Sequence, residues 1–391
     1  MKPMIYLDHA ATTGVRPEVL EEMLPYLQEE YGNPSSVYDL AGRSRKAVEE
    51  ARQRIAGGIG AKPEEIYFTG GGSESDNWVL KGIASLHPHC HIITTRIEHH
   101  AVLHACEWLE QQGMRLTYLP VNEQGMVSAE QVRKAIRPDT VLISVMFANN
   151  EIGTIQPIRE IGRIARRAHV LFHTDAVQAF GHVPIDVNEM NIDLMSASAH
   201  KLSGPKGVGM LYIKAGIELP PLIHGGGQER HMRAGTENVP GIAGFGKAAQ
   251  LAFSTMRERS EKISGLRDYL IRQVLALVPY TRLNGSRGRR LPGNANFSFQ
   301  FIEGESLLVL LDTRGICASA GSACSTGSPE PSHVLTAIGL PKELAHASVR
   351  LTIGEENTKE EIDYTIQQIM ELVSRLREVS DEYDAFTRQQ G

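Results

Sequence analysis

The chain has 391 residues, of which 41% are hydrophobic and 22% are charged, and its formal net charge at pH 7 is -6. This length exceeds one ordinary hydrophobic core and predicts two domains. The acidic balance argues against direct binding of nucleic acid, and the sequence lacks the run of roughly 20 apolar residues that spans a membrane.

Helices and strands alternate over the first two thirds of the chain. Residues 16–32 and 44–60 show the spacing of amphipathic helices. Strands are expected at 65–70, 91–95, 115–121, 140–147, 170–176, 193–199 and 208–213, with helices at 75–86, 100–112, 128–137 and 157–168. This alternation predicts an α/β fold with parallel pairing, helices on both faces of the sheet and ligand binding beyond the carboxyl ends of the strands.

The pattern changes after residue 240. A long helical stretch is followed by strands and helices in a different order, expected at 241–277, 294–301, 305–315, 347–354 and from 358 onward. We therefore predict a large domain of residues 15–255 and a smaller α+β domain of residues 1–14 and 256–391.

Three features at the ends of predicted strands form a candidate site. The segment F-T-G-G-G-S (68–73) ends a strand in three glycines, and Ser73 is expected to be the N-cap of the next helix. Open backbone N–H groups, a hydroxyl and a helix N-terminus form a phosphate site, although an ordinary glycine-rich turn fits the same residues. Asp175 ends an apolar strand. It is expected to be either a buried carboxylate with a charged partner or the N-cap of a helix. Lys201 follows the next strand. It is expected to be either an amine nucleophile in a crevice or a solvated loop residue.

Together these three features match the requirements of pyridoxal phosphate. A lysine binds the aldehyde as a Schiff base, an acid keeps the ring nitrogen protonated and the glycine cradle holds the phosphate. His99 ends a further strand and is expected to stack on the ring or move protons, or else to cap a helix. Asn150 and Gln178 offer neutral hydrogen bonds to the ring oxygen.

Further candidates for anion binding lie in the second half of the chain. A glycine-rich loop at 224–238 contains Arg233 and Thr236, which are a second set of candidate phosphate-binding residues. Arg350 lies in an apolar strand, where its planar guanidinium would bind a substrate carboxylate or form a structural salt bridge.

Cysteine and histidine usage gives two further expectations. The histidines of H-P-H-C-H (87–91) lack the paired spacing of zinc ligands, and C-x-x-C is absent, so we expect no metal site. Four cysteines do not make a disulfide framework in a chain of this length, so we expect thiols and a cytoplasmic protein. Cys317 is expected in a strand, and Cys324 lies in A-S-A-G-S-A-C-S-T-G-S-P-E-P-S-H (318–333), which glycine and proline predict to be a mobile surface loop.

Several segments occur in the order found in one family. They are Y-L-D-H-A-A-T-T (6–13), Y-G-N-P-S-S (31–36), E-S-D-N (74–77), E-H-H-A-V-L (98–103), N-N-E-I-G (149–153), T-D-A-V-Q (174–178), S-A-H-K-L-S-G-P-K-G (198–207), H-G-G-G-Q-E-R (224–230) and G-S-A-C-S-T-G-S-P-E-P-S-H-V-L (321–335). In these segments the chain resembles the NifS/IscS-type cysteine desulfurases. The resemblance implies pyridoxal-phosphate fold type I, the aspartate aminotransferase type.

The resemblance also implies a role for each candidate. Lys201 would bind the cofactor aldehyde, Asp175 would pair with the pyridinium nitrogen, and His99 would stack on the ring. The other cofactor contacts would come from Gly72, Ser73, Asn150, Gln178, Ser198 and His200, and in a homodimer from Thr236, which would reach the phosphate in the other subunit. Asn33 and Arg350 match positions that hold the substrate carboxylate, and Cys324 matches the sulfur acceptor.

The implied reaction is that of a cysteine desulfurase (EC 2.8.1.7), which converts L-cysteine to L-alanine. Lys201 would remove the α-proton, and the Cys324 thiolate would attack the substrate sulfur to form a persulfide. An acceptor protein for iron–sulfur cluster assembly or tRNA thiolation would then take the sulfur. An unperturbed thiol has a pKa of about 8.5, so a base is needed, and His99 is the candidate.

Alternative functions and departures from the family pattern complete the prediction. The alternatives are a selenocysteine lyase, another pyridoxal-phosphate enzyme of the aminotransferase family, or a non-catalytic sulfur- or metal-binding scaffold. The family often has Ala-Thr where this chain has Gly72-Ser73. Many members carry a histidine after N-P-S-S, where this chain has Val37, Tyr38 and Asp39, so the role of that histidine is not carried over.

Overall fold

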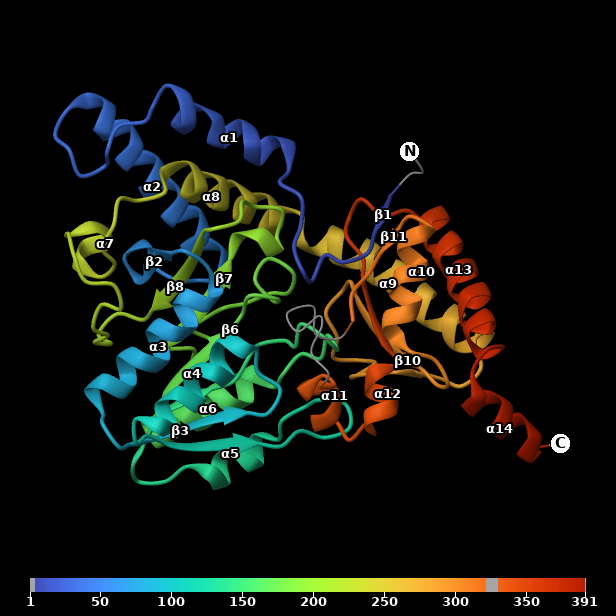
Figure 1. The fold of residues 1–391 in the computed structure, drawn as a ribbon. Helices are drawn as coiled ribbons and strands as arrows, with labels where there is room; N and C mark the ends of the chain where they lie inside the picture. Colours follow the sequence, from blue (N-terminus) through green and yellow to red (C-terminus); the bar gives the residue numbers. More distant parts are fainter. Residues whose placement is uncertain (1–3, 321–329, 391) are drawn as a thin grey trace.

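The computed structural model describes residues 4–320 and 330–390, and a seven-stranded sheet lies at the centre of its larger part (Figure 1). The strands are β2 (Ile66–Thr69), β3 (His91–Thr95), β4 (Arg115–Leu119), β5 (Thr140–Ser144), β6 (Leu171–Asp175), β7 (Leu194–Ser198) and β8 (Gly209–Ile213). Their order in the sheet is β2-β8-β7-β6-β5-β3-β4. The pairs among β3 to β7 are parallel, as the alternation of helices and strands predicts.

Strand β8 departs from that expectation, because it is antiparallel to both of its neighbours, β2 and β7. Only residues 199–208 connect β7 to β8, and they contain one short helix, η2 (Ala199–Lys201). A parallel connection needs a crossover of a dozen or more residues, so the chain turns back instead. This tight turn holds Lys201 beside the carboxyl end of β7.

Helices cover both faces of the sheet. They are α1 (Pro17–Gln28), α2 (Asp39–Gly58), η1 (Pro63–Glu65), α3 (Gly72–Leu86), α4 (His100–Gln111), α5 (Ala129–Ala135), α6 (Ile158–Ala168), α7 (Gln228–His231) and α8 (Val239–Ser254). One core contains residues of α2, α6 and α8, and a second contains residues of α3 and α4. Successive residues of β7 alternate between them, with Leu194 in the second core and Met195 in the first, as the two-residue period of a strand requires.

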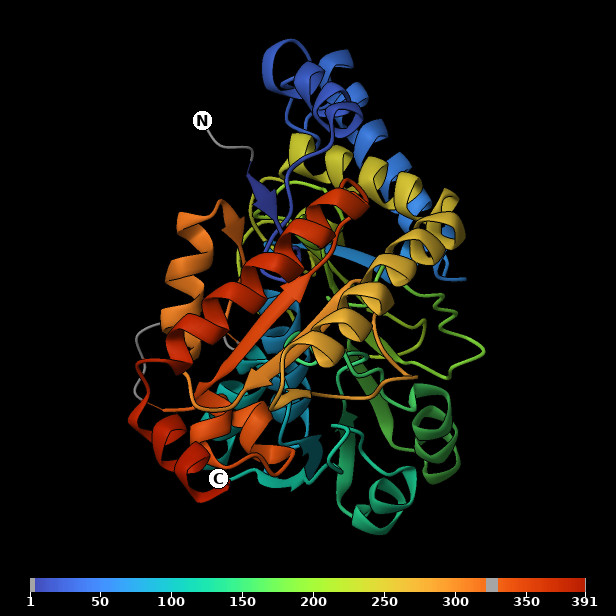
Figure 2. The same ribbon diagram turned by 90° about the vertical axis from the view of Figure 1, so that its right-hand side faces the viewer.

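The smaller part of the molecule contains both ends of the described chain (Figures 1 and 2). Its elements are β1 (Ile5–Tyr6), α9 (Met256–Leu277), β9 (Thr281–Leu283), β10 (Asn294–Phe299), α10 (Gly304–Thr313), β11 (Ile316–Cys317), α11 (His333–Ala337), α12 (Lys342–His346), β12 (Ser348–Thr352), α13 (Lys359–Arg377) and α14 (Asp381–Gln390). An antiparallel sheet has the order β12-β10-β9, and β1 pairs in parallel with β11. Cys317 therefore lies in a strand, as predicted.

A separate hydrophobic core supports the division into two domains. Ile5 and Leu7 pack with Phe297, Leu311 and Ile369 in the smaller part. The predicted long helix at 241–277 is two helices, α8 and α9, which meet at Thr255. We therefore propose the division at residue 255 that the sequence predicts. Within the described residues, no helix combines the length and apolar character needed to cross a membrane.

Candidate active site

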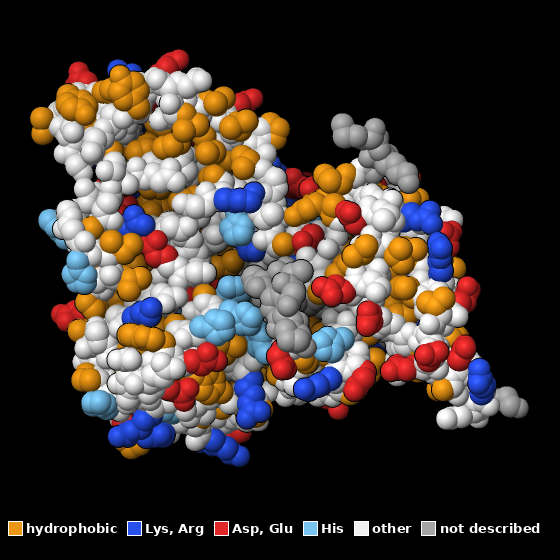
Figure 3. Space-filling view, viewed as in Figure 1, with side chains coloured by type: hydrophobic (Ala, Val, Ile, Leu, Met, Phe, Trp, Pro, Cys, Tyr) orange, Lys and Arg blue, Asp and Glu red, His pale blue; other side chains and the backbone are white. Residues whose placement is uncertain are grey.

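A cavity of about 400 Å³ opens at the carboxyl ends of the parallel strands, where the two parts of the molecule meet. Histidine side chains gather on this face, near its centre (Figure 3). The predicted site residues that line the cavity are Gly72, Ser73, His99, Asn150, Asp175, Gln178, Ser198, His200, Lys201 and Arg350. The fold therefore brings together residues that are up to 278 positions apart in the sequence, from Gly72 to Arg350.

The glycine-rich end of the cavity is formed by the start of α3. The N-cap is Gly71, with a φ of 152°, and α3 begins at Gly72, so our prediction of Ser73 as the N-cap is wrong. Glycine at the cap leaves the backbone N–H groups of the first turn uncovered, with the Ser73 hydroxyl beside them. A Cβ on Gly72 would lie 2.5 Å from Cγ2 of Val177, so alanine at this position would require the Val177 side chain to move.

Asp175 is the last residue of β6 and is only 6% exposed. Its Oδ1 accepts a hydrogen bond from the backbone N–H of Val177 at 2.9 Å. Burial raises the pKa of Asp175 to about 6, while the Val177 hydrogen bond and the nearby Lys201 act in the opposite direction. At neutral pH Asp175 is therefore a buried carboxylate that faces the cavity. It could form an ion pair with the protonated ring nitrogen of pyridoxal phosphate.

Lys201 reaches from the turn after β7 to the N-terminal segment of the chain. Its Nζ donates hydrogen bonds to the carbonyl oxygens of Ala10 and Ala11 at 2.7 and 2.6 Å. Gln178 Nε2 also donates to the Ala10 carbonyl, at 3.0 Å. The segment around Ala10 therefore closes one side of the site and orients both side chains.

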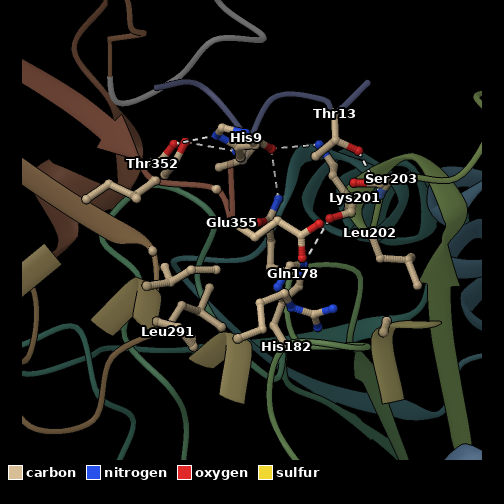
Figure 4. Close-up of a pocket in the computed structure, with 18 of the residues that line it drawn as sticks. His9, Thr13, Gln178, His182, Lys201, Leu202, Ser203, Leu291, Thr352 and Glu355 are labelled. Atoms are coloured by element: carbon tan, nitrogen blue, oxygen red, sulfur yellow. Dashed lines mark hydrogen bonds between the residues drawn. The ribbon is translucent and has the colours of Figure 1, made fainter. Parts of the chain in front are cut away.

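A second cavity, of about 80 Å³, lies on the other side of Lys201 (Figure 4). His182 lines it and donates a hydrogen bond from Nε2 to the Lys201 carbonyl at 2.9 Å. Thr13 also lines it, and its hydroxyl donates to the His200 carbonyl at 2.9 Å and accepts from the Ser203 N–H at 2.8 Å. These bonds fix the turn that carries Lys201.

His99 is the N-cap of α4, which was one of the two alternatives for this residue. Its Nδ1 accepts a hydrogen bond from the Ala101 N–H at 3.1 Å. Burial, with smaller effects from Lys201 and His100, lowers the pKa of His99 to about 4. A neutral ring with an accepting Nδ1 carries its proton on Nε2, so His99 presents a donor to the cavity. Its role as base for a thiol stays a prediction, and it requires Nδ1 to be freed from the Ala101 N–H so that it can accept a proton.

Arg350 in β12 is 1% exposed and forms the salt bridge that was one of its two predicted alternatives. Its Nη2 donates to Asp8 Oδ1 at 2.9 Å, which is a structural salt bridge, and its Nη1 donates to the Asn150 carbonyl at 3.0 Å. Its Nε is buried without a hydrogen-bond partner among the described residues. This N–H group is the part of Arg350 that a bound carboxylate would satisfy.

Three predicted residues, Asn33, Arg233 and Thr236, lie outside the cavity lining. Asn33 is exposed in the loop between α1 and α2, and its Oδ1 accepts from the Ser35 N–H at 3.0 Å. Thr236 is exposed in the loop before α8. Arg233 of that loop forms two hydrogen bonds to the Glu74 carboxylate, at 2.9 and 3.1 Å, in the first turn of α3. Cys324, the predicted sulfur acceptor, lies outside the described residues.

The prediction from sequence missed several residues of the site. Asp8, which holds Arg350, had no local signal because its partner is 342 positions away. His100 and His333 also line the cavity, and His333 Nε2 donates to the Glu98 carbonyl at 2.9 Å. The His333 Nδ1 can then accept from His100 Nε2 at 3.3 Å, which joins α11 to α4.

The residues of the cavity fit pyridoxal phosphate. They include an amine, a buried carboxylate that faces it, an imidazole and a helix N-terminus with a hydroxyl. The α3 N-terminus would hold the phosphate and Asp175 the ring nitrogen. The cofactor would supply an electron sink for the carbanion formed at the substrate α-carbon.

Comparisons with known proteins agree with this fit. The aminotransferase class-V family model matches residues 5–365. The chain belongs to this family of pyridoxal-phosphate-dependent enzymes, which have fold type I.

Within that family the chain belongs to the cysteine desulfurases. It is 56% identical over 378 residues to a protein of Methanosarcina thermophila named cysteine desulfurase IscS, covering 96% of this chain and 93% of that one. A solved structure titled NifS-like protein has a TM-score of 0.90 and 39% identity, covering 96% of this chain and 100% of the other. A structure titled SspA in complex with cysteine has a TM-score of 0.80 and 40% identity, covering 90% and 100%.

The protonation of Asp175 predicts a pH dependence of cofactor affinity. The carboxylate is needed to pair with the ring nitrogen, and the pKa of Asp175 is raised to about 6. The affinity of the cofactor-free protein for pyridoxal phosphate should therefore fall by about tenfold per pH unit below about 6. Asp175→Asn is the control, because the phosphate also titrates near pH 6 and does so in both proteins. An equal pH slope in the two proteins, measured by equilibrium titration, would contradict the assignment.

Proposed function

We propose that this protein removes sulfur from L-cysteine, releases L-alanine and passes the sulfur to an acceptor protein. The observation that carries the proposal is the single cavity that holds Lys201, Asp175, His99 and Arg350 within a cysteine desulfurase fold. A structural relative is titled as a complex with cysteine, which supports cysteine as the substrate.

Each of these side chains has a distinct task in the proposed reaction. Arg350 binds the substrate carboxylate through its unsatisfied Nε, while Asp8 fixes the guanidinium. Lys201 removes the α-proton, since its amine lies beside the cavity and is held by the Ala10 and Ala11 carbonyls. His99 donates from Nε2, because its Nδ1 is occupied by the Ala101 N–H.

The sulfur leaves the site on Cys324 in this proposal. The Cys324 thiolate forms a bond to the substrate sulfur as the substrate C–S bond breaks, and the electron pair of that bond stays with the three-carbon fragment that becomes alanine. The resulting persulfide is the form in which an acceptor protein, for iron–sulfur cluster assembly or tRNA thiolation, takes the sulfur. We assign this role by the match of 321–335 to the family pattern.

We also propose a homodimer located in the cytoplasm. Apolar side chains are exposed along α1 and the following loop, at Leu20, Leu24, Leu27, Tyr31 and Val37. Figure 3 shows hydrophobic side chains gathered in this region of the surface. An exposed apolar patch of this kind suits a second copy of the chain, which would bring Thr236 to the other cavity. If sedimentation analysis finds a monomer and that monomer has full activity, the dimer proposal is wrong.

The free thiols of Cys90, Cys106 and Cys317 support a location in the reducing cytoplasm.

The direct test measures both products of the reaction. Purified protein with pyridoxal phosphate, L-cysteine and a reductant should form alanine and sulfide in equal amounts. Selenocysteine as the substrate tests the alternative function. If alanine forms only from selenocysteine, the protein is a selenocysteine lyase and the proposal is wrong.

A further inference from the structure

A buried polar cluster lies beneath α3 and beside Asp175. It is formed by Asp76 of α3 and by side chains on one face of three neighbouring strands, Ser144 of β5, His173 of β6 and Ser196 of β7. Strand pairing places them together, since Ser144 pairs with His173 and Ser196 with Asp175. Asp76 and Asp175 line the same cavity.

Asp76 is the unusual member of this cluster. It is 1% exposed, and its Oδ1 has no hydrogen-bond partner among the described residues. His173 Nε2 lies 3.7 Å from Asp76 Oδ1. The two ring nitrogens of His173 are bonded to the hydroxyls of Ser144 and Ser196, at 2.9 and 3.1 Å.

The charges around Asp76 favour its neutral form. Asp175 is the negatively charged group that acts on it most strongly, and its charge opposes a second negative charge there. Burial lowers the pKa of His173 to about 3, so the imidazole is neutral and supplies no compensating charge. The positive charge of Lys201 lowers the pKa of Asp175 and so favours its carboxylate form. An ionised carboxylate that is buried without a cation, next to a second carboxylate, carries a large free-energy cost.

Burial, followed by the charge of Asp175, raises the pKa of Asp76 well above its ordinary value, and the Ser196 hydrogen bond only partly offsets this. The direction agrees with the geometry. Of the two buried carboxyls, Asp175 is stabilised as the carboxylate by the Val177 N–H and by Lys201, and Asp76 has neither.

We propose that Asp76 is a positioning residue that stays protonated in the active enzyme, so that Asp175 alone carries the negative charge that faces the cofactor ring. The Asp76 hydroxyl is then a hydrogen-bond donor beside the Asp175 carboxylate. This inference rests on the proposed pairing of Asp175 with the ring nitrogen.

Infrared spectroscopy of the cofactor-loaded enzyme tests the protonation directly. A protonated carboxyl gives a carbonyl stretching band that shifts in D₂O, and Asp76→Asn should remove one such band at neutral pH. The matched control is Glu98→Gln, which changes a second fully buried carboxyl whose pKa burial raises to about 8. It should remove a different band. If Asp76→Asn leaves every carboxyl band in place, Asp76 is ionised and the proposal is wrong.

Cofactor binding tests the positioning role. Asp76→Ala removes the hydroxyl donor and should weaken affinity for pyridoxal phosphate by about tenfold, as expected for one hydrogen bond to a charged group. Asp76→Asn is neutral, keeps a donor and should restore affinity to within about threefold of the unaltered enzyme. If Asn weakens binding as much as Ala, a negative charge at Asp76 is required and the proposal is overturned.

Nitrogen NMR with ¹⁵N-labelled cofactor separates this role from a merely structural one. The ring nitrogen should stay protonated over the same pH range in Asp76→Asn and in the unaltered enzyme. If the ring nitrogen loses its proton at a lower pH in Asp76→Asn than in the unaltered enzyme, the proposal is overturned. Asp175→Asn should lose the protonated signal altogether. If that signal persists, the pairing assigned to Asp175 is wrong, whereas the infrared result still decides the protonation of Asp76.

Discussion

Cys324→Ala should abolish sulfide release from cysteine, with a rate at least roughly 1,000-fold below that of the unaltered enzyme, because the attacking thiolate is gone. Cofactor absorbance and its change on adding cysteine should remain, since Lys201 and Asp175 are untouched. The rate of sulfide formation and the cofactor spectrum, recorded on the same sample, check both expectations.

Cys317→Ala is the matched control for this experiment. Cys317 lies in β11, and burial, with the nearby Asp312 and Asp8, raises the pKa of its thiol. A thiol of this kind is a poor nucleophile at neutral pH, so the control should keep its sulfide release. Unchanged sulfide release by Cys324→Ala would refute the assignment of Cys324.

Lys201→Ala should prevent covalent attachment of the cofactor and lower alanine formation by at least roughly 1,000-fold, since both the amine nucleophile and the proposed base are removed. Borohydride treatment followed by mass spectrometry should find the cofactor on the peptide that contains Lys201 only in the unaltered enzyme. The variant also loses the hydrogen bonds to the Ala10 and Ala11 carbonyls. Thermal unfolding should therefore be measured to confirm that the protein remains folded.

Lys214→Ala is the control for the lysine experiment. Lys214 follows β8 and lies 13 residues after Lys201 in the sequence. Its Nζ forms an ion pair with Asp193 Oδ1 at 3.1 Å. Cofactor attachment in this variant should equal that of the unaltered enzyme. Attachment that survives Lys201→Ala would show that another lysine binds the cofactor.

The elements of the larger part were predictable because local pattern and tertiary structure agree there. The strands at 91–95 and 170–176 are apolar runs bounded by turns, and they become β3 and β6 within one residue at each end. The direction of β8 was not predictable from its own residues, because the length of the connection from β7 decides it. The break between α8 and α9 was missed because no glycine or proline near Thr255 marks it in the sequence.

Much of the site was predictable from position alone. Asp175, Ser198 and Lys201 follow or end parallel strands, and the carboxyl ends of such strands meet at one edge of a sheet. Ser73 was placed at the wrong helical position because the sequence does not show that Gly71 takes a backbone conformation with positive φ. The capping bond of His99 also depends on the conformation of the turn before α4.

The sequence by itself determined which chemical groups the protein carries and which edge of the sheet presents them, because both follow from residue type and strand order. Only the tertiary structure decided how the charges are paired. The pair of Asp8 with Arg350, the bonds of Lys201 to Ala10 and Ala11 and the approach of Asp76 to Asp175 join residues that are distant in the chain. The physical reason is that the burial and the partners of a charged group arise from packing between elements, which no local pattern records.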